Sequence, residues 1–395
     1  MAKPTIRFRG FDDEWEQRKL GDVLDDMYNG QTPSRNKSEY WNGNIKWLSS
    51  GELNRGTVYD SIEMITEDGQ KSANLRIVPK GTFIMAITGL EAAVTRGNCA
   101  LLGFDTTLNQ SCMALFPKKD LLTSDFLFQW YRKVGEEYGL NYTQGTKQQS
   151  YNAELIKILP ISLPSVAEQK KIASYLSHID HLITLHQRKC DETKKLKKYM
   201  LQKMFPQNGS KVPEIRFKGF TDEWEQRKLD DVVEFLDTMR KPLEGAKRIS
   251  GPYPYYGASG IVDYVDGYLF DEELILLSED GANIIDRNYP VCFLASGKYW
   301  VNNHAHVLRT KQGNENNFIC NSLERKDYTQ YNTGMAMPKL NKETCKKIPI
   351  LCPGFEEQKK IGDYFRSLDN LITLHQHKCE EIKKLKKFML QNMFI

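Results

Sequence analysis

The chain has 395 residues, of which 40% are apolar and 27% charged, and its formal net charge is +4. This length predicts two or three domains, and the composition is that of an ordinary protein with packed cores. No apolar run is long enough to cross a bilayer, and residues 1–20 lack the apolar core of a signal peptide. We therefore expect a cytoplasmic protein that makes no membrane contact. The small positive excess does not by itself indicate nucleic-acid binding.

The eight cysteines are scattered along the chain, without a C-x-x-C pair. This pattern is typical of free, buried thiols in a reducing compartment. We expect no metal site.

Two segments of the chain recur, and they divide it into parts. PTIRFRGFDDEWEQRKLGDV at 4–23 returns at 213–232 as PEIRFKGFTDEWEQRKLDDV, with about 16 of 20 positions identical. A segment that starts at Pro164 returns from Pro353, with about 27 of 42 positions identical. The stretches between share no convincing run of residues. The repeat predicts this order of parts: an arm (1–23), a variable domain (24–163), a helix (164–205), a linker (206–212), a second arm (213–232), a second variable domain (233–352) and a second helix (353–395).

The first variable domain combines short predicted strands with polar loops. Residues 45–48 and 81–90 are typical of strands, and GTKQQSYN at 145–152 is a polar loop that precedes the strand before Pro164. Polar and basic side chains beside aromatic rings suit contacts to base edges and phosphates, although most polar loops only solvate a surface. The candidate DNA contacts here are Gln31, Thr32, Ser34, Arg35, Lys37, Tyr40, Trp41, Ser49, Ser50, Thr88, Arg96, Gln144, Lys147 and Gln148.

The repeated segment predicts a long helix with one apolar face. Ser165 and Glu168 have the spacing of a capping box, and about 40 residues form a rod of about 60 Å. The seam positions step by four and three: Ile172, Leu176, Ile179, Ile183, His186 and Cys190 in the first copy, and Ile361, Phe365, Leu368, Ile372, His375 and Cys379 in the second.

The two copies are natural partners for each other. If a pseudo-two-fold axis relates the halves, the helices run antiparallel, and His186 and His375 face each other near the midpoint. We expect these histidines to pack in the seam, since a pH switch or metal clip has no further support in the sequence. The basic runs at 194–198 and 383–387 are either a solvated helix face or a docking surface for an acidic partner or for phosphates.

The second variable domain is predicted to be mainly β with some helix, because short Val/Ile/Leu/Tyr runs alternate with Gly, Asp and Asn turns. His304 and His306 have an H-x-H spacing but no matching third or fourth ligand, so a structural or hydrogen-bonding role is favoured over a metal. The candidate DNA contacts here are Lys241, Tyr255, Tyr256, Ser259, Asn302, Asn303, His304 and Arg309.

Catalytic signatures are missing from the sequence. The chain has no Pro-Pro dipeptide of the kind found in the Asn/Asp-Pro-Pro-aromatic loop of enzymes that methylate amino groups, no GxxxxGK[ST] loop and no GxSxG elbow. Glu324 and Lys326 match the tail of a nuclease E-x-K site, but no upstream acidic cluster accompanies them. We expect no catalytic residues and no enzyme activity from this chain alone.

The arms with FKGF and WEQRKL, the exits ILPISLP and KIPILCP, and the EQKKI helices resemble the specificity subunit of type I restriction–modification enzymes. TPSRNKSEYWNGNIKWLSSGEL resembles one target-recognition domain of that family, and GPYPYYGASGIVDYVDGYLFDEE, SGKYWVNNHAHVL and GMAMPKLN resemble another. The resemblance covers essentially the whole chain, and the arms are most similar to those of Gram-positive, staphylococcus-type members.

The resemblance implies an α+β architecture with two mixed α/β target-recognition domains separated by two long antiparallel coiled-coil helices, in a circular, pseudo-two-fold arrangement. Each domain would recognise one half of a split, asymmetric site on double-stranded DNA, and the helices would fix the spacer. Two modification subunits and two restriction subunits would be the protein partners. They would carry S-adenosylmethionine, ATP and Mg²⁺, and this chain would bind no cofactor. The alternative is a coiled-coil scaffold whose variable domains bind proteins.

Overall fold

The structure is a computed structural model that describes residues 3–145 and 147–395, with the backbone alone at residue 247. The chain forms two compact units. The first unit comprises residues 1–185 and 378–395, and the second comprises residues 186–377. The two long helices α4 (Val166–Lys203) and α9 (Phe355–Asn392) therefore each contribute to both units. Among the described residues, every helix is too short or too polar to span a bilayer.

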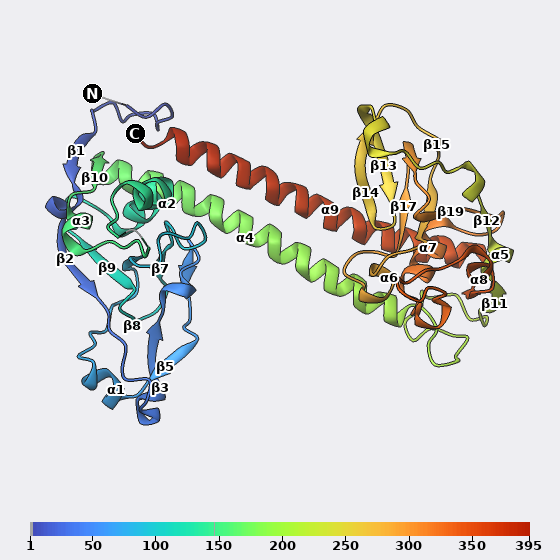
Figure 1. Ribbon diagram of the computed structural model, residues 1–395, viewed down its shortest axis with the longest axis horizontal. Coiled ribbons are helices and arrows are strands. Elements are labelled where there is room, and N and C mark those ends of the chain that lie inside the picture. The colour runs from blue at the N-terminus through green and yellow to red at the C-terminus, as the bar shows by residue number, and fades with distance from the viewer. Residues whose placement is uncertain (1–2, 146) are drawn as a thin grey trace. The chain divides into compact units, whose positions relative to one another are not determined.

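The first unit contains three sheets and the helix α2 (Figure 1). A five-stranded sheet has the order β2-β9-β6-β7-β4, a three-stranded sheet the order β5-β3-β8, and β1 pairs with β10. The elements are β1 (Glu16–Lys19), β2 (Leu24–Asn29), β3 (Trp41–Leu48), β4 (Thr57–Val58), β5 (Glu63–Ile65), α1 (Glu67–Ser72), β6 (Phe83–Ala86), β7 (Cys99–Leu102), β8 (Thr107–Leu108), β9 (Cys112–Pro117), α2 (Ser124–Asn141), α3 (Ala153–Lys157) and β10 (Pro160–Leu163).

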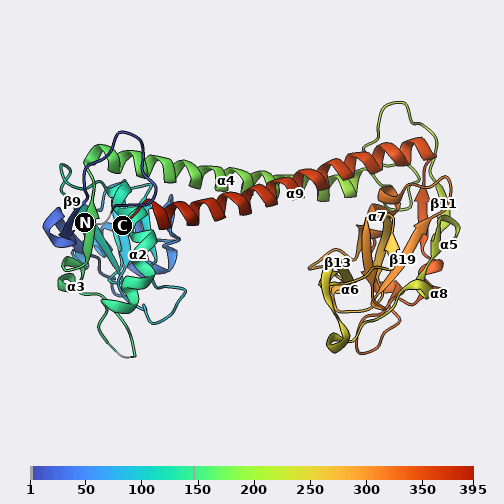
Figure 2. The same cartoon turned by 90° about the horizontal axis from the view of Figure 1, so that it is seen from above.

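The second unit is built in the same way. Its helix α7 packs against β17 of the main sheet and lies beside β19, as Figure 2 shows for β19. One four-stranded sheet has the order β12-β19-β16-β17, another the order β14-β13-β18-β15, and β11 pairs with β20. The elements are β11 (Glu225–Lys228), α5 (Leu229–Val232), β12 (Val233–Phe235), β13 (Ser250–Gly257), β14 (Gly260–Val265), β15 (Phe270–Asp271), β16 (Leu274–Ser278), α6 (Asn283–Asp286), β17 (Cys292–Ala295), β18 (Lys298–Val301), β19 (Ala305–Thr310), α7 (Asn316–Glu324), α8 (Lys342–Lys346) and β20 (Pro349–Cys352).

The two variable domains share one topology although their sequences do not match. The strands β2-β9-β6-β7 and β12-β19-β16-β17 stand in the same antiparallel order, and the pairs β3/β8 and β13/β18 are both parallel. The arm strands also pair in one register, with Glu16 opposite Leu163 and Glu225 opposite Cys352. The domains are therefore two versions of one topology, although no shared run of residues indicates it.

The repeated residues at the start of each long helix attach the arm. Arg7 donates two hydrogen bonds to Glu168, at 2.7 and 2.8 Å, and Arg216 donates two to Glu357, both at 2.7 Å. The predicted capping box is only half formed. The Glu168 amide donates to Ser165 Oγ at 3.3 Å, but the Glu168 carboxylate is taken by Arg7.

The next residue of each EQKKI motif attaches the variable domain. Gln169 Oε1 accepts from the amide of Thr123, the N-cap of α2, and Gln358 Oε1 accepts from the amide of Glu315, the N-cap of α7. The Glu315 side chain also approaches α9, where a Cβ on Gly362 would lie 2.0 Å from a Glu315 carboxylate oxygen. This approach explains the glycine inside α9, which is Ala173 in α4.

The cores mix residues that are distant in sequence. In the first unit, Phe394 near the C-terminus packs against Trp15 of the arm and Phe126 of α2, with centroids 6.3 and 5.3 Å away. Three counterparts repeat this cluster in the second unit, where Phe205 packs against Trp224 and Phe318 at 5.9 and 5.4 Å. All six rings are buried, and burying a ring of this size contributes about 1.5–3 kcal/mol. Each core therefore depends on the end of a long helix that starts elsewhere in the chain.

Candidate nucleic-acid interface

In the first unit, Arg35 is held over an aromatic pair. Its guanidinium lies 3.8 Å from the ring centroid of Trp41 and 5.0 Å from that of Trp47. Both of its terminal nitrogens bond the carboxylate of Glu63, and this hydrogen bond lowers the pKa of Glu63. Trp47 is buried, whereas the Arg35 side chain is 52% exposed. The cluster therefore fixes one basic side chain on an aromatic platform at the surface.

The other candidates around β3 form a polar surface. Lys37 Nζ lies 3.0 Å from Tyr40 Oη, and Trp41 Nε1 donates to the Ser34 carbonyl at 3.1 Å. Thr32 Oγ1 bonds the side chain of Gln110. Gln31, Ser34 and Lys37 are exposed, and Thr32, Tyr40, Trp41, Ser49 and Ser50 are partly exposed. Gln110 was missed by the sequence prediction, because the fold alone brings the turn before β9 to the end of β2.

The loop at 144–150 closes on itself as a hairpin. The backbones of Gln144 and Ser150 exchange two hydrogen bonds of 3.0 Å, and Ser150 also forms a bridge with Thr88. Lys147 and Gln148 are exposed at the tip, while Thr146 lies outside the described residues. The described residues of the predicted polar loop thus have their ends paired beside the end of β6.

Arg96, another predicted DNA contact, is partly exposed and bonds the backbone. Its guanidinium donates to the carbonyls of Leu90 and Glu91, both at 2.9 Å. Its side chain therefore holds the loop that follows β6.

The second unit has a hairpin at the equivalent place, with other side chains. Thr333 donates its amide to the Lys339 carbonyl at 2.8 Å, and Lys339 forms a bridge with Asp280. A Cβ on Gly334 would lie 1.8 Å from the Met337 carbonyl oxygen, so the turn needs glycine. Met335 at the tip is fully exposed. The two hairpins therefore occupy equivalent places in the shared topology and differ in the side chains at their tips.

The remaining candidates of the second domain divide into exposed and internal groups. Tyr255 is buried, and its hydroxyl accepts from the Leu243 amide; Asn302 is also buried, and its side chain accepts from the His304 amide. These two side chains therefore lie beneath the surface and support the backbone that forms it. Arg309 is ion-paired with Glu272 and Glu234. Lys241, Ser259, Asn303 and His304 are exposed, and Tyr256 and Arg309 are partly exposed.

The two histidines of the H-x-H pair have separate roles. His304 Nδ1 lies 2.8 Å from Asp280, at the surface. His306 is buried, with Nδ1 2.7 Å from Asp237 and Nε2 2.8 Å from the Leu340 carbonyl. Burial opposes the ionisation of Asp237, but the hydrogen bond and charge of His306 keep the pKa of Asp237 below its usual value. His306 therefore anchors the residue that follows the 333–339 hairpin.

The seam residues of the two long helices have different neighbours at different positions along the helices. His186 and His375 place their Nδ1 atoms 3.0 Å apart, and Cys190 Sγ lies 4.0 Å from the Ile372 carbonyl oxygen. Farther along, the buried seam residues pack into the domain cores as well as against the other helix. In the first unit these are Ile172, Leu176 and Ile179, with Ile183 at the edge, and in the second unit Ile361, Phe365 and Leu368. Cys379 is buried.

Comparison with known proteins identifies the family. The family model of the type I restriction modification DNA specificity domain matches residues 12–195 and again 221–384. A type I restriction enzyme MjaIX specificity subunit from Methanocaldococcus jannaschii is 23% identical over 96% of this chain and 92% of its own length. A putative specificity subunit from Haemophilus influenzae is 35% identical, over 42% of each chain.

A solved structure shows the same fold. The S subunit of a type I restriction–modification system from M. genitalium superposes with a TM-score of 0.72 at 16% identity, covering 100% of this chain and 99% of that one. Two copies of the family domain thus account for most of the chain. This protein belongs to the specificity subunits of type I restriction–modification systems, the non-catalytic subunits that carry the DNA-recognition domains.

Proposed function

We propose that this chain recognises one asymmetric, two-part DNA site, with one variable domain for each half. The observation that carries the proposal is the pair of equivalent hairpins, 144–150 and 333–339. Two backbone hydrogen bonds close the first and one closes the second, yet one tip presents Lys147 and Gln148 and the other Met335. Identical frames with identical tips would favour a palindrome, whereas unlike tips favour two different half-sites.

The length of the two long helices supports a role in setting the spacer between the half-sites. Each has 38 residues, which corresponds to about 57 Å at 1.5 Å per residue. Half-sites on one face of a duplex lie about 34–36 Å apart, one helical turn, which is within that length. We propose that the helices set the spacer and dock two modification subunits. The modification subunits would bind S-adenosylmethionine, and two restriction subunits would use ATP and Mg²⁺. We expect the whole complex to lie in the cytoplasm.

Selection from a random duplex library by the complex of this chain with its modification subunits tests the proposal. We expect one enriched motif with two unlike specified parts around an unspecified spacer of constant length, bound with a Kd of about 10⁻⁸–10⁻¹¹ M. A palindrome, one uninterrupted motif, or no enrichment would contradict it. Binding that ignores duplex sequence would favour the alternative, a scaffold whose domains bind proteins.

A further inference from the structure

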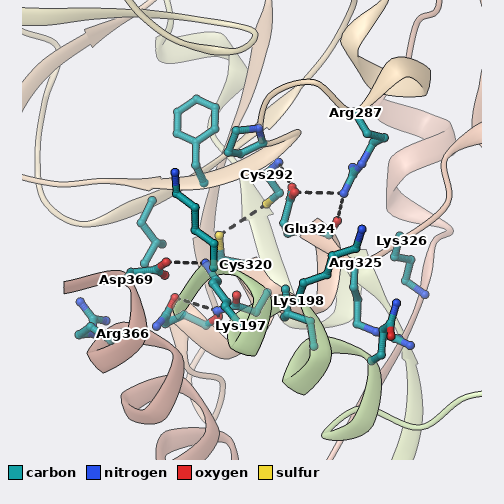
Figure 3. A pocket seen from close by; sticks show the side chains of 18 of the residues that line it. Lys197, Lys198, Arg287, Cys292, Cys320, Glu324, Arg325, Lys326, Arg366 and Asp369 are labelled. Carbon is teal, nitrogen blue, oxygen red and sulfur yellow. Dashed lines mark hydrogen bonds and ion pairs between the residues drawn. The ribbon is translucent and has the colours of Figure 1, made fainter. Parts of the chain in front are cut away.

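A cavity of about 1420 Å³ opens in the second unit, where the last turns of α4 and the first half of α9 meet β17 and the end of α7 (Figure 3). Its wall includes parts of each of these elements and residues 206–208 of the linker. The cavity is larger than a single small anion needs. Its wall therefore suits an extended ligand.

The wall of the cavity is rich in positive charge. Seven cationic and four anionic side chains line it, all within the described residues. The cations are Lys194, Lys197, Lys198, Arg287, Arg325, Lys326 and Arg366, and the anions are Glu273, Glu324, Asp327 and Asp369.

The carboxylates of the wall are already engaged. Asp327 accepts from the amide and hydroxyl of Thr329 at 2.9 and 2.7 Å. The other three each pair with one cation: Asp369 with Lys197 at 2.6 Å, Glu324 with Arg287 at 3.0 Å, and Glu273 with Arg366 at 2.7 Å. Four cations of the wall, Lys194, Lys198, Arg325 and Lys326, make no ion pair with any carboxylate in the part of the chain that the structure describes.

Two of these four cations are partly buried side by side. Arg325 stacks over the Phe205 ring, 5.4 Å from its centroid, and donates to the Pro206 carbonyl at 3.4 Å. Burial and the neighbouring Arg325 charge lower the pKa of Lys326 to about 8. Withdrawing a cation from water costs free energy unless an anion accompanies it. The cavity thus has an excess of positive charge, and a bound polyanion would offset the free-energy cost of burying it.

We propose that this cavity binds the sugar–phosphate backbone of the duplex beside the half-site that the second domain recognises. This rests on the proposed function. Duplex DNA carries one charge per about 1.7 Å of its axis, so several phosphates are available to the four cations. Position along the chain supports DNA over an acidic protein segment. Gln330 and Tyr331 line the cavity, and Asn332 accepts from the amides of Gly334 and Lys339 and so fixes the 333–339 hairpin.

The repeat supplies a matched control. Lys383 and Lys387 of α9 are the counterparts of Lys194 and Lys198 of α4, in the same K-K-L-K-K run, but they belong to the first unit and do not line the cavity. Lys194 and Lys198 are both exposed on α4, so their replacement by glutamine leaves the cores untouched.

The experiment compares Lys194→Gln/Lys198→Gln with Lys383→Gln/Lys387→Gln, each as the full chain in complex with modification subunits. Affinity for the target duplex and for an unrelated duplex is measured over a range of salt concentrations. We expect the first variant to weaken binding of both duplexes by the same factor. We also expect it to reduce the slope of log affinity against log salt by about 1–2, with the same methylated sequence. The control variant should keep the wild-type slope.

Three other results would overturn the proposal. An unchanged slope would show that Lys194 and Lys198 do not contact phosphates. A changed target sequence would show that these lysines contact bases. Normal DNA binding with weaker assembly of the modification subunits would assign the cavity to an acidic segment of a protein. A wild-type complex that selects no sequence would instead refute the proposed function, which keeps the two failures distinct.

Discussion

Lys386 of α9 donates a hydrogen bond to Asp180 of α4, and together they tie the two long helices inside the first unit. The repeat places Lys197 and Asp369 at the equivalent positions, and these two are joined at 2.6 Å in the second unit. Asp180 has a further partner, Arg132 of α2, at 2.6 Å. One carboxylate therefore serves two cations and links the variable domain to both helices.

Because Asp180 has two cationic partners, replacing Asp180 should destabilise the protein more than replacing Lys386. Asp180→Asn leaves Arg132 and the buried Lys386 without a carboxylate, and we expect it to lower the free energy of unfolding by roughly 2–3 kcal/mol. Lys386→Met leaves Asp180 paired with Arg132 and removes a buried cation, so its cost should be under about 1 kcal/mol. Urea unfolding of both variants measures the difference, and equal losses would contradict the account.

The same lysine predicts a dependence on pH. Burial, with the nearby Arg132 charge, lowers the pKa of Lys386 to about 8, against about 10.4 in an unfolded chain. Between these values the unfolded chain binds more protons than the folded one, so the free energy of unfolding rises with pH, and below pH 8 the penalty is complete. Wild type should gain stability relative to Lys386→Met from pH 7 to pH 10. A difference that does not change with pH would contradict this sign.

The chain ends are joined in space in the way that the linker joins the halves. The Ile6 amide donates to the Asn392 carbonyl at 2.9 Å, and at the equivalent place the Ile215 amide donates to the Lys203 carbonyl at 2.9 Å. A circular permutant opened within 206–212, with residue 395 connected to residue 4 by a short flexible linker, should therefore fold. We expect its Tm to be within a few degrees of wild type. An insoluble permutant, or the loss of its cooperative unfolding transition, would show that the first unit does not fold when residues 395 and 4 are joined.

The sequence predicted the order of the repeated parts, but it did not predict the topology of the variable domains or which of their side chains are exposed. Internal repetition predicted the arms, the long helices and the approach of His186 to His375, because a period of this length and an apolar stripe depend only on residue order. The common topology of the variable domains was missed, since sheet order follows from packing that many sequences satisfy. For the same reason, Tyr255 and Asn302 appeared to be surface candidates: a tyrosine and an asparagine in a turn-rich stretch do not reveal that their polar atoms bond the backbone.

Helix length offers a separate test. Seven residues inserted into both α4 and α9, next to His186 and His375, keep the apolar seam in phase and add about 10 Å, or about three base pairs of duplex. We expect a spacer longer by about three base pairs with both half-sites unchanged. Methylation mapping of a plasmid library measures it, and an altered half-site at constant spacing would contradict the role of the helices.

The most direct test of the central claim gives the protein two identical variable domains. Residues 24–163 are replaced by a second copy of 233–352, with Ala173→Gly so that α4 can accept Glu315 as Gly362 does. Methylated adenines are then mapped by long-read sequencing of DNA treated with the complex of this variant and its modification subunits. We predict that the two-part asymmetric site becomes an inverted repeat of the half recognised by the second domain. An unchanged asymmetric site, or a new sequence in both halves, would contradict the assignment of one half-site to each domain.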